Sequence, residues 1–473
     1  MDFITRLYEH QRKAVEKLSK VKVGALYLEM GTGKTRTALE LINKRIEAGK
    51  VNKVIWLCPC SVKENLRRDI IKHTGEFDND LITICGIETL SSSIKANIKL
   101  LSLVKNNNCY LIVDESNLVK NFKAKRTERI IELSKLCTYK LILNGTPISK
   151  NEADLFSQWY ILDYRILGYR SFWSFAANHL EYDERIPGRV IKTLNVHYLV
   201  EKIAPYSYQI RKDECLDLPV KSYDKVYFEL TDDQREHYKW IADELIFELD
   251  EFDSTTIYRL FTGLQHVTSG FKVDPGKKLT KTNFFEDPLN NPRIETLLNV
   301  VDSFGEYKTI IFAKYTDEIN TIVKVLNEKY GEGIAVPFNG EVSQKNRQEN
   351  LVKFQNEARY LVANKRCGAY GLNLQFCSCI IYYSNDWDYA TRSQSEDRVH
   401  RIGQNEHVDI VDICAAYTLD ERILKCLEKK EGLVDSFKDE LEEIKDKKDL
   451  YAWIHNVKRR KNIREKCSEL EDD

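Results

Sequence analysis

Two arginines in the stretch 394–404, QSEDRVHRIGQ, are the residues whose type and spacing point most directly to chemistry. Arg398 and Arg401 stand three positions apart, so in a helix they would lie on one face. A guanidinium that reaches the γ-phosphate of a nucleotide stabilises the transferring phosphoryl group, and its loss costs about 10³ to 10⁵ in rate. The alternative is a solvated, salt-bridged helix turn, which is the better interpretation unless a phosphate site exists elsewhere.

A glycine-rich loop near the start of the chain is a candidate for that phosphate site. The segment 28–35, LEMGTGKT, follows an apolar run at 23–28 and precedes a helical stretch at 36–46. Strand, glycine loop and helix in this order are the context of a P-loop. The strict pattern has glycine where Leu28 stands, so the prediction rests on this context. A glycine-rich turn without nucleotide is the alternative.

Consecutive residues of this loop supply the groups that bind nucleotide phosphates. Gly31, Thr32 and Gly33 would present backbone amides to an oxyanion. Lys34 can reach the β- and γ-phosphates, and the Thr35 hydroxyl can ligate Mg²⁺. The loop therefore predicts a nucleoside triphosphate and Mg²⁺ as cofactors.

A second apolar run ends in adjacent carboxylates. The segment 110–117 reads YLIVDESN, which is a buried strand followed by Asp114 and Glu115. Asp114 would hold Mg²⁺ through water, and Glu115 would orient or deprotonate the attacking water. A strand that ends in solvated acids is the alternative, and the presence of Lys34 upstream argues against it.

Two further residues fit a nucleotide site. Gln11, ahead of the first apolar run, has an amide that can donate and accept at once, as recognition of adenine requires. Thr146, in the turn 143–148, is placed to sense the γ-phosphate and couple its presence to the rest of the chain. An exposed helix glutamine and a plain turn are the alternatives. With Gln11 as the base contact, ATP is the expected nucleotide.

Short apolar runs alternate with longer amphipathic stretches, which is the pattern of βα units on a parallel sheet. The expected strands are 23–28, 54–58, 81–85, 110–113 and 141–143, and then 309–313, 333–338, 360–363, 380–383 and 408–415. The fold class is therefore α/β, with two parallel-sheet lobes. The expected domains are a first lobe at 1–228 with a helical insertion from about 154, a helical connection at 229–285, a second lobe at 286–430 and a charged helical tail at 431–473.

Composition indicates a globular protein of several domains. The chain has 473 residues, 42% of them hydrophobic and 31% charged, which is too long for a single core. The net charge of -1 gives no global basic signature, so any nucleic-acid binding must come from local patches.

Neither cysteine spacing nor apolar runs indicate secretion or a membrane. The twelve cysteines include no Cys-x-x-Cys pair, which favours reduced buried thiols over zinc. There is no apolar signal core, and no run approaches the ~18 residues of a membrane helix. We expect a soluble protein without a membrane partner, cytoplasmic in a bacterial or virus-infected cell or nuclear in a eukaryote.

The order of these segments resembles the Swi/Snf group of superfamily 2 helicase-like ATPases. The resemblance rests on segments 7–11, 31–35, 114–121, 144–148, 208–219, 231–238, 310–312, 338–354, 368–374, 387 and 394–404. The last of them, with its trailing HRIGQ, is the most specific to the group. The resemblance implies two RecA-like lobes that close on ATP, with Arg398 and Arg401 as fingers and Gln394 positioning water or phosphate.

The resemblance also implies an activity, which is ATP hydrolysis coupled to translocation on double-stranded DNA. By the same resemblance, the candidate nucleic-acid contacts are Ser61, Lys120, Lys314, Asn339, Gly371, Asn373 and Trp387, with 365–366 as a further candidate. Loop lysines are usually only solvated, and a tryptophan is as often a core residue. A basic run at 458–466 has equally balanced interpretations, as phosphate contacts or as an exposed charged helix.

Departures from the group's pattern bear on coupling. Ser116 and Asn117 stand where Ala or Gly followed by His is commoner, and Asn144 stands where Thr is common. Little chain lies outside the motor segments, so we expect a minimal motor of bacterial, phage or viral type and not a nucleosome remodeller. Two alternatives remain: a helicase that separates the strands of DNA or RNA, and a non-catalytic, ATP-gated DNA-binding scaffold.

Overall fold

The structure is a computed structural model that describes residues 1–145, 151–182, 190–215, 218–365, 372, 374–386 and 388–429, apart from 248–253 and 275–279. The side chains at 247, 254–257 and 390 are outside the description as well. The chain divides into two compact units, with the boundary between Leu218 and Pro219.

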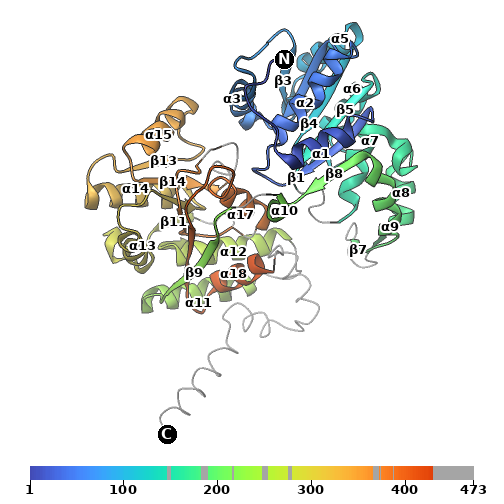
Figure 1. The fold of residues 1–473 in the computed structure, drawn as a ribbon. Coiled ribbons are helices and arrows are strands. Elements are labelled where there is room, and N and C mark those ends of the chain that lie inside the picture. The colour runs from blue at the N-terminus through green and yellow to red at the C-terminus, as the bar shows by residue number, and fades with distance from the viewer. Residues whose placement is uncertain are drawn as a thin grey trace, which may run out of the picture. The chain divides into compact units, whose positions relative to one another are not determined.

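The first unit is built on a six-stranded parallel sheet with helices on both faces (Figure 1). In the order β3-β2-β4-β5-β1-β8, its strands are β3 (Ile82–Gly86), β2 (Lys53–Cys58), β4 (Cys109–Asp114), β5 (Tyr139–Asn144), β1 (Val23–Leu28) and β8 (Ser207–Ile210). The helices are α1 (Glu9–Leu18), α2 (Lys34–Glu47), α3 (Lys63–Thr74), α4 (Thr89–Ser92), α5 (Ile94–Asn106), α6 (Lys125–Lys135), α7 (Ala153–Leu167), α8 (Phe172–His179), α9 (Val196–Ile203) and α10 (Lys212–Cys215). Short 3-10 turns η1 (Cys60–Val62), η2 (Ser116–Val119) and η3 (Ala204–Tyr206) and a hairpin of β6 (Leu180–Tyr182) and β7 (Val190–Thr193) complete the unit.

Burial on both faces explains the continuous apolar runs in this sheet. Along β1, Ala25 and Tyr27 enter one core, whereas Leu26 and Leu28 enter the core on the other face. The first core also takes in Trp159 of α7, so the helical region after 153 packs against the sheet as part of the first unit.

The second unit has its own six-stranded parallel sheet. In the order β13-β14-β12-β15-β16-β9, its strands are β13 (Ala335–Phe338), β14 (Tyr360–Asn364), β12 (Thr309–Ala313), β15 (Cys379–Tyr382), β16 (Val408–Ala415) and β9 (Lys221–Phe228). The helices are α11 (Asp232–Phe247), α12 (Ser254–Thr268), α13 (Pro292–Ser303), α14 (Thr316–Tyr330), α15 (Gln344–Asn356), α17 (Tyr389–Glu396) and α18 (Leu419–Glu428). A hairpin of β10 (Phe271–Asp274) and β11 (Thr280–Asn283) and the turn η4 (Pro288–Asn290) complete it. The predicted α/β class with two parallel sheets is confirmed, and all ten predicted strands are present.

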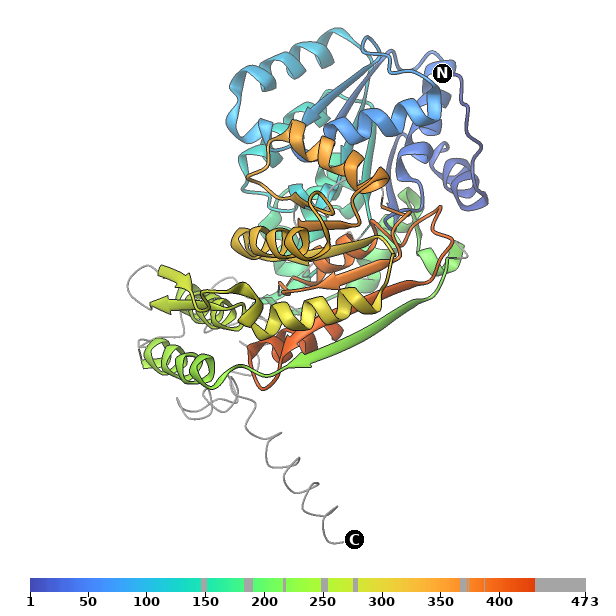
Figure 2. The ribbon, with the colours of Figure 1, turned by 90° about the vertical axis from the view of Figure 1, so that its left-hand side faces the viewer.

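The boundary of the second unit differs from the predicted one at 228. Strand β9 pairs with β16 along its whole length, from Lys221 opposite Val408 to Phe228 opposite Ala415, and lies at the edge of the second sheet (Figure 2). The predicted connection at 229–285 contains α11 and α12, whose apolar residues share one core with α13 and α18. That region is therefore part of the second unit. The predicted tail at 431–473 lies outside the described residues.

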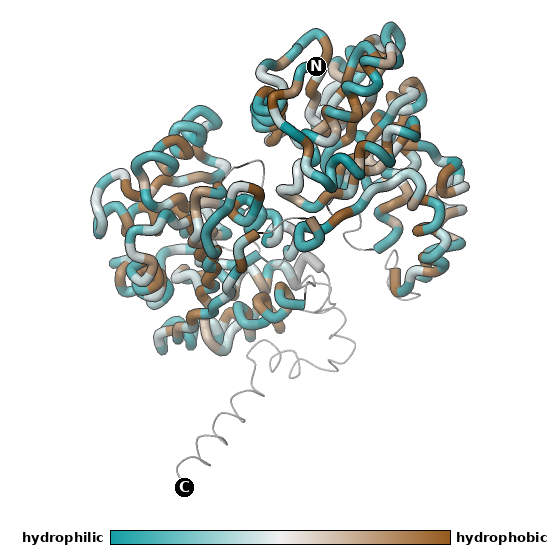
Figure 3. Tube along the Cα trace, viewed as in Figure 1, coloured by the Kyte–Doolittle hydropathy of each residue, from teal (hydrophilic) through white to brown (hydrophobic). Residues whose placement is uncertain are grey.

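Hydropathy along the chain follows this layering, with hydrophobic segments in the strands and mixed colours along the helices (Figure 3). None of the helices in the described parts of the chain is both long and apolar enough to cross a membrane.

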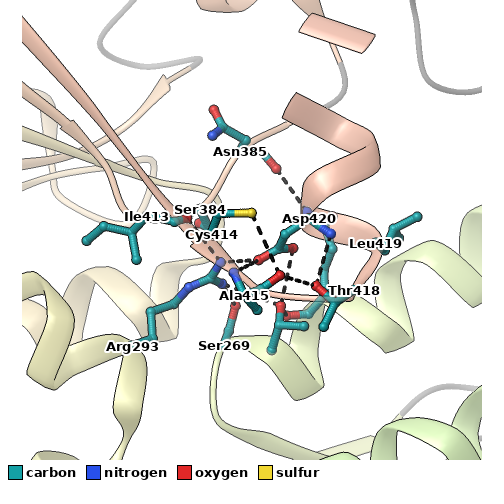
Figure 4. Close-up of polar contacts among 12 residues, drawn as sticks. Ser269, Arg293, Ser384, Asn385, Ile413, Cys414, Ala415, Thr418, Leu419 and Asp420 are labelled. Carbon is teal, nitrogen blue, oxygen red and sulfur yellow. Dashed lines mark hydrogen bonds and ion pairs between the residues drawn. The ribbon is translucent and has the colours of Figure 1, made fainter. Parts of the chain in front are cut away.

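A buried ion pair joins three elements of the second unit (Figure 4). Arg293 of α13 pairs with Asp420 of α18, and its Nη1 donates to Ser269 Oγ at 3.1 Å, just after α12. Arg293 and Asp420 are 1% and 6% exposed. Because a buried charge without a partner is costly, the pair ties these elements together.

Candidate functional site

The predicted phosphate loop lies at the carboxyl end of β1 and leads directly into α2. Gly31 and Gly33 have φ values of 81° and 89°, a left-handed conformation that glycine adopts without strain. Lys34 is the first residue of α2, and its Nζ donates to the Leu28 carbonyl at 3.3 Å. The loop thus has the backbone shape of an anion site at a helix N-terminus.

Helix α1 braces this loop through two adjacent side chains. Gln11 Nε2 donates to the carbonyls of Thr32 at 3.2 Å and Gly33 at 3.3 Å, and its Oε1 accepts from the Tyr8 amide at 2.9 Å. His10 Nε2 lies 2.8 Å from the Thr32 carbonyl. The structure therefore places Gln11 against the phosphate loop. His10 was missed by the sequence analysis, because a lone histidine beside a motif residue gives no signal of its own.

Replacing Gly33 with alanine is expected to weaken ATP binding at least tenfold. A Cβ at this position would lie 2.0 Å from Gln11 Nε2, and the φ of 89° would strain any other residue. Such strain costs on the order of 1–3 kcal/mol, and about 1.4 kcal/mol is a tenfold change in affinity. The measurement is titration with a fluorescent ATP analogue. Gly75→Ala is the matched control, since its φ is 85° but nothing lies within 4 Å of the added carbon. Equal affinities in the two variants would contradict the prediction.

The two predicted carboxylates lie at the carboxyl end of β4. The β5 strand separates β4 from β1, with Asp114 paired with Leu143 of β5. Burial and the neighbouring Glu115 raise the pKa of Asp114 to about 7, whereas the charge of Lys34 lowers it. Lys34 and Asp114, distant in sequence, are therefore close enough to interact electrostatically.

A divalent cation suits this arrangement. A half-buried carboxylate whose charged form is disfavoured is stabilised by a cation placed beside it. Thr35, on the first turn of α2, adds a hydroxyl oxygen of the kind that Mg²⁺ accepts. The residues present thus fit the predicted metal.

The residue after these carboxylates has a specific partner. Ser116 is fully buried, and its Oγ donates to Gln158 Oε1 at 2.5 Å, on α7. Gln158 in turn donates to the Asp154 carbonyl at 2.8 Å, and Lys120 Nζ lies 3.5 Å from the Asp154 carboxylate. The unusual serine therefore connects the end of β4 to α7, and Lys120 contacts the same helix.

The sequence predicted a helix through Arg398 and Arg401. In the structure this arginine segment, residues 397–404, is not helical. Helix α17 ends at Glu396, so Arg398 and Arg401 follow it in turns and do not share a helical face. The Arg398 carbonyl accepts from the Leu374 amide at 3.0 Å, which replaces a helical hydrogen bond. Val399 between them is fully buried in the core. Core packing therefore ends the helix before the two arginines.

The alternative of a solvated helix turn is also wrong, because this segment is mostly buried. Arg398 is 8% exposed and Gln404 is 5% exposed. Arg401 Nη1 lies 3.5 Å from the Leu372 carbonyl. Gln394 lies on α17 and is half-buried.

Three of the predicted nucleic-acid contacts have distinct surroundings. Ser61 is exposed in η1. Lys314, after β12, donates from Nζ to Gln265 Oε1 at 2.5 Å. Asn339 is buried, and its Oδ1 accepts from the amides of Glu341 and Val342 at 3.0 and 3.1 Å. Its side chain shapes its own turn. The residues Thr146, Gly371, Asn373 and Trp387 and the basic run 458–466 lie outside the described residues.

Lys365, which the sequence also offered as a candidate nucleic-acid contact, lies directly after β14 and is buried. Its Nζ donates to Asn385 Oδ1 at 3.2 Å. Burial lowers its pKa to about 7, with Arg392 and Lys314 lowering it further and Asp386 and Asp412 opposing. The folded unit therefore disfavours the charged form of this lysine.

Replacing Lys365 with methionine is expected to flatten the pH dependence of stability between pH 7 and 9. The folded pKa lies below the ordinary value of 10.5, so in this window the unfolded chain binds a proton that the folded chain has lost. Stability of the wild type therefore rises with pH, by at most about 1.4 kcal/mol per pH unit. Urea unfolding at pH 7 and at pH 9 measures this rise in the free energy of unfolding. Lys353→Met, on the exposed face of α15, is the control. An equal rise in the Lys365 variant would contradict this account.

Comparison with known families matches both units. The SNF2-related domain matches residues 77–269, and the helicase conserved C-terminal domain matches residues 292–403. These two domains in this order confirm the resemblance to the Swi/Snf group of superfamily 2 helicase-like ATPases seen in its motifs.

Several relatives match most of this chain but only part of their own length. An ATP-dependent helicase of Mycoplasma genitalium is 25% identical over 460 residues, which cover 91% of this chain and 42% of that protein. A putative ATP-dependent helicase/translocase of Bacillus subtilis is 26% identical and covers 69% of this chain and 35% of that protein. The TATA-binding protein-associated factor MOT1 of Saccharomyces cerevisiae is 23% identical, and the match covers 67% of this chain and 20% of that protein. The chain thus spans less than half the length of these relatives.

Among solved structures, the SWI2/SNF2 ATPase core of Sulfolobus solfataricus in complex with dsDNA is similar at 22% identity and a TM-score of 0.41. The similarity covers 90% of this chain and 92% of that one.

Proposed function

We propose that this chain is an ATP-driven motor that hydrolyses ATP and translocates on, or remodels, double-stranded DNA. The observation that carries the proposal is the meeting of a phosphate loop and a half-buried carboxylate at one edge of the first sheet. Lys34 follows β1 and Asp114 ends β4, so both lie at the carboxyl edge of the same parallel sheet although they are far apart in sequence. The match to the SNF2-related domain and the similarity to proteins named as ATP-dependent helicases support it.

In this proposal the first unit binds the nucleotide. The amides of Gly31, Thr32 and Gly33 and the Lys34 ammonium hold the phosphates, while Gln11 recognises adenine. Thr35 and Asp114 would hold Mg²⁺, which supplies positive charge to the β- and γ-phosphates. Glu115 orients the attacking water and accepts its proton.

The second unit supplies the groups that act on the transition state. Arg398 and Arg401 neutralise charge on the γ-phosphoryl group when ATP is bound, and Gln394 positions water or phosphate. Thr146 couples the γ-phosphate to the nucleic-acid contacts. Those contacts, sorted by unit, are Ser61 and Lys120 in the first and Lys314, Asn339, Gly371, Asn373 and Trp387 in the second. They would grip phosphates of the duplex, and a change in their spacing would move it.

The test is ATP hydrolysis measured with duplex DNA, single-stranded DNA and RNA side by side, paired with displacement of a triplex-forming strand. Stimulation by duplex DNA with triplex displacement and without strand separation is the expected result. Stimulation by single strands with unwinding would instead establish a strand-separating helicase. Nucleotide binding without turnover on any nucleic acid would establish a non-catalytic scaffold.

A further inference from the structure

The guanidinium of Arg392, on α17, is buried and bonded on every side. Arg392 is 5% exposed, and its Nη1 and Nη2 donate to the two carboxylate oxygens of Asp412 at 2.6 and 2.9 Å. Its Nε donates to Glu396 Oε1 at 2.9 Å, and Nη1 also donates to Asn385 Oδ1 at 2.9 Å. The guanidinium carbon lies 3.5 Å from the centre of the Tyr382 ring. A planar fork held in this way has one orientation.

Glu396 extends this contact to the edge strand of the sheet. Its Oε2 accepts from Lys221 Nζ at 2.9 Å and from Tyr223 OH at 2.7 Å, both on β9. Asp412 lies on β16, the neighbour of β9. One pair of side chains on α17 therefore fixes the end of this helix to two adjacent strands, which run side by side in Figure 2.

The arginine segment begins directly after Glu396, the residue that contacts β9. Glu396 is the last residue of α17, and its carbonyl accepts from the amides of Val399 at 3.0 Å and His400 at 2.9 Å. His400 Nε2 lies 2.8 Å from the Pro219 carbonyl, just before β9. The backbone that bears Arg398 is thus held directly by the residue that Arg392 and β9 fix in place.

Stability alone is a weak reason for such a cluster. Buried ion pairs lose solvation, and apolar residues of similar volume often stabilise a protein as well or better. The same unit already has a buried ion pair, Arg293 with Asp420, whose two residues lie outside the arginine segment (Figure 4). What distinguishes the Arg392 cluster is its place, immediately ahead of Arg398 and Arg401.

We propose that Arg392 and Glu396 are positioning residues that fix the arginine segment for catalysis through Asp412, Lys221 and Tyr223. Both side chains bond only partners of the second unit in these contacts, and the phosphate loop belongs to the first, so their loss reduces the rate of hydrolysis and leaves ATP affinity unchanged. The inference rests on the proposed function, because it requires that Arg398 and Arg401 act in ATP hydrolysis.

The first experiment compares Arg392→Lys and Glu396→Gln with the wild type in steady-state ATP hydrolysis with duplex DNA. Lysine keeps the charge but loses the fork, and glutamine keeps the size but loses the charge. A displacement of about 1 Å costs about 100-fold in rate, so we expect kcat to fall about 10- to 100-fold. The Kd for a fluorescent ATP analogue should stay within about twofold.

The matched control is Asp420→Asn, which disrupts a comparably buried ion pair in the same unit. It should lower the unfolding temperature while kcat per folded molecule stays at the wild-type value. The folded fraction of every variant is measured by circular dichroism, so that loss of fold is separated from loss of rate.

A charge reversal tests the ion pair between Arg392 and Asp412. Arg392→Asp and Asp412→Arg each place like charges together, and each should lower kcat more than 100-fold. The double reversal restores opposite charges between α17 and β16, so kcat should recover at least tenfold over either single variant.

The outcomes separate the inference from the proposed function. If the wild type hydrolyses no ATP with any nucleic acid, both the proposed function and the positioning role of Arg392 and Glu396 are wrong. If Arg401→Ala abolishes hydrolysis but Arg392→Lys and Glu396→Gln keep the wild-type kcat, only the positioning role is wrong. The positioning role is also wrong if Asp420→Asn lowers kcat per folded molecule as much as Arg392→Lys and Glu396→Gln do, since the cluster would then serve stability alone.

Discussion

Replacing Arg401 with alanine is expected to lower kcat for ATP hydrolysis by about 10³- to 10⁵-fold while leaving the Kd for ATP within about threefold of wild type. The reason is that a finger arginine meets charge that develops only as the phosphoryl group transfers. The residue lies in a turn after α17, with Nη1 3.5 Å from the Leu372 carbonyl. Single-turnover hydrolysis and titration with a fluorescent ATP analogue give the two quantities separately.

Two comparison variants make this prediction specific. Lys34→Ala removes the cation at the phosphate loop, so it should lose ATP binding as well as turnover. Arg359→Ala removes an arginine of the second unit that pairs with Glu306 at 3.1 Å, and it should keep both. If Arg401→Ala loses ATP binding as fully as Lys34→Ala does, its assignment to the transition state is wrong.

The predictable part of the fold is the part built from buried, continuous apolar runs. Central strands such as β2 and β12 are covered on both faces, so their sequences KVIWLC and TIIFA stand out from the surrounding chain. The loops at their carboxyl ends could be placed as well, because parallel strands deliver those ends to one edge of a sheet. This is why the phosphate loop and Asp114 were predicted together.

The edge strands could not be predicted in the same way. β9 reads KSYDKVYF, and most of its side chains are exposed or half-buried, so it lacks the apolar run of a central strand. Its place is set by hydrogen bonds to β16, which is distant in sequence. The predicted boundary at 228 missed this pairing, which makes 221–228 the first strand of the second unit.

The cluster around Arg392 was hidden for a related reason. In sequence, Arg392 and Glu396 are charged residues among other polar ones, and Asp412 is an acid in an apolar run; charged residues are usually solvated. Only the register of β16 beside α17 brings them together in the core. The helix end at Glu396 follows from the burial of Val399 and the hydrogen bond from the Leu374 amide to the Arg398 carbonyl, whereas spacing alone predicted a continuous helix.

The second large effect is expected from Glu115→Gln, which should lower kcat by about 10² to 10⁴ while ATP still binds. Glutamine preserves the size and polarity of the side chain but cannot accept the proton of the attacking water. Glu115 has a φ of 50°, a left-handed conformation that costs a non-glycine residue about 1–2 kcal/mol. The chain therefore holds a strained glutamate directly after Asp114, at the end of β4.

Glycine at this position tests why the strain is retained. Glu115→Gly relieves the strain, and its more flexible unfolded state offsets the gain, so stability should stay within about 1 kcal/mol of wild type. Turnover should be lost all the same. Urea unfolding, ATP titration and hydrolysis with duplex DNA measure the three properties on each variant. If Glu115→Gln hydrolyses ATP at the wild-type rate, another group must activate the water. If both variants stay folded, bind ATP and fail to turn it over, the defect lies in the attack of water, and the strained backbone is kept for that carboxylate.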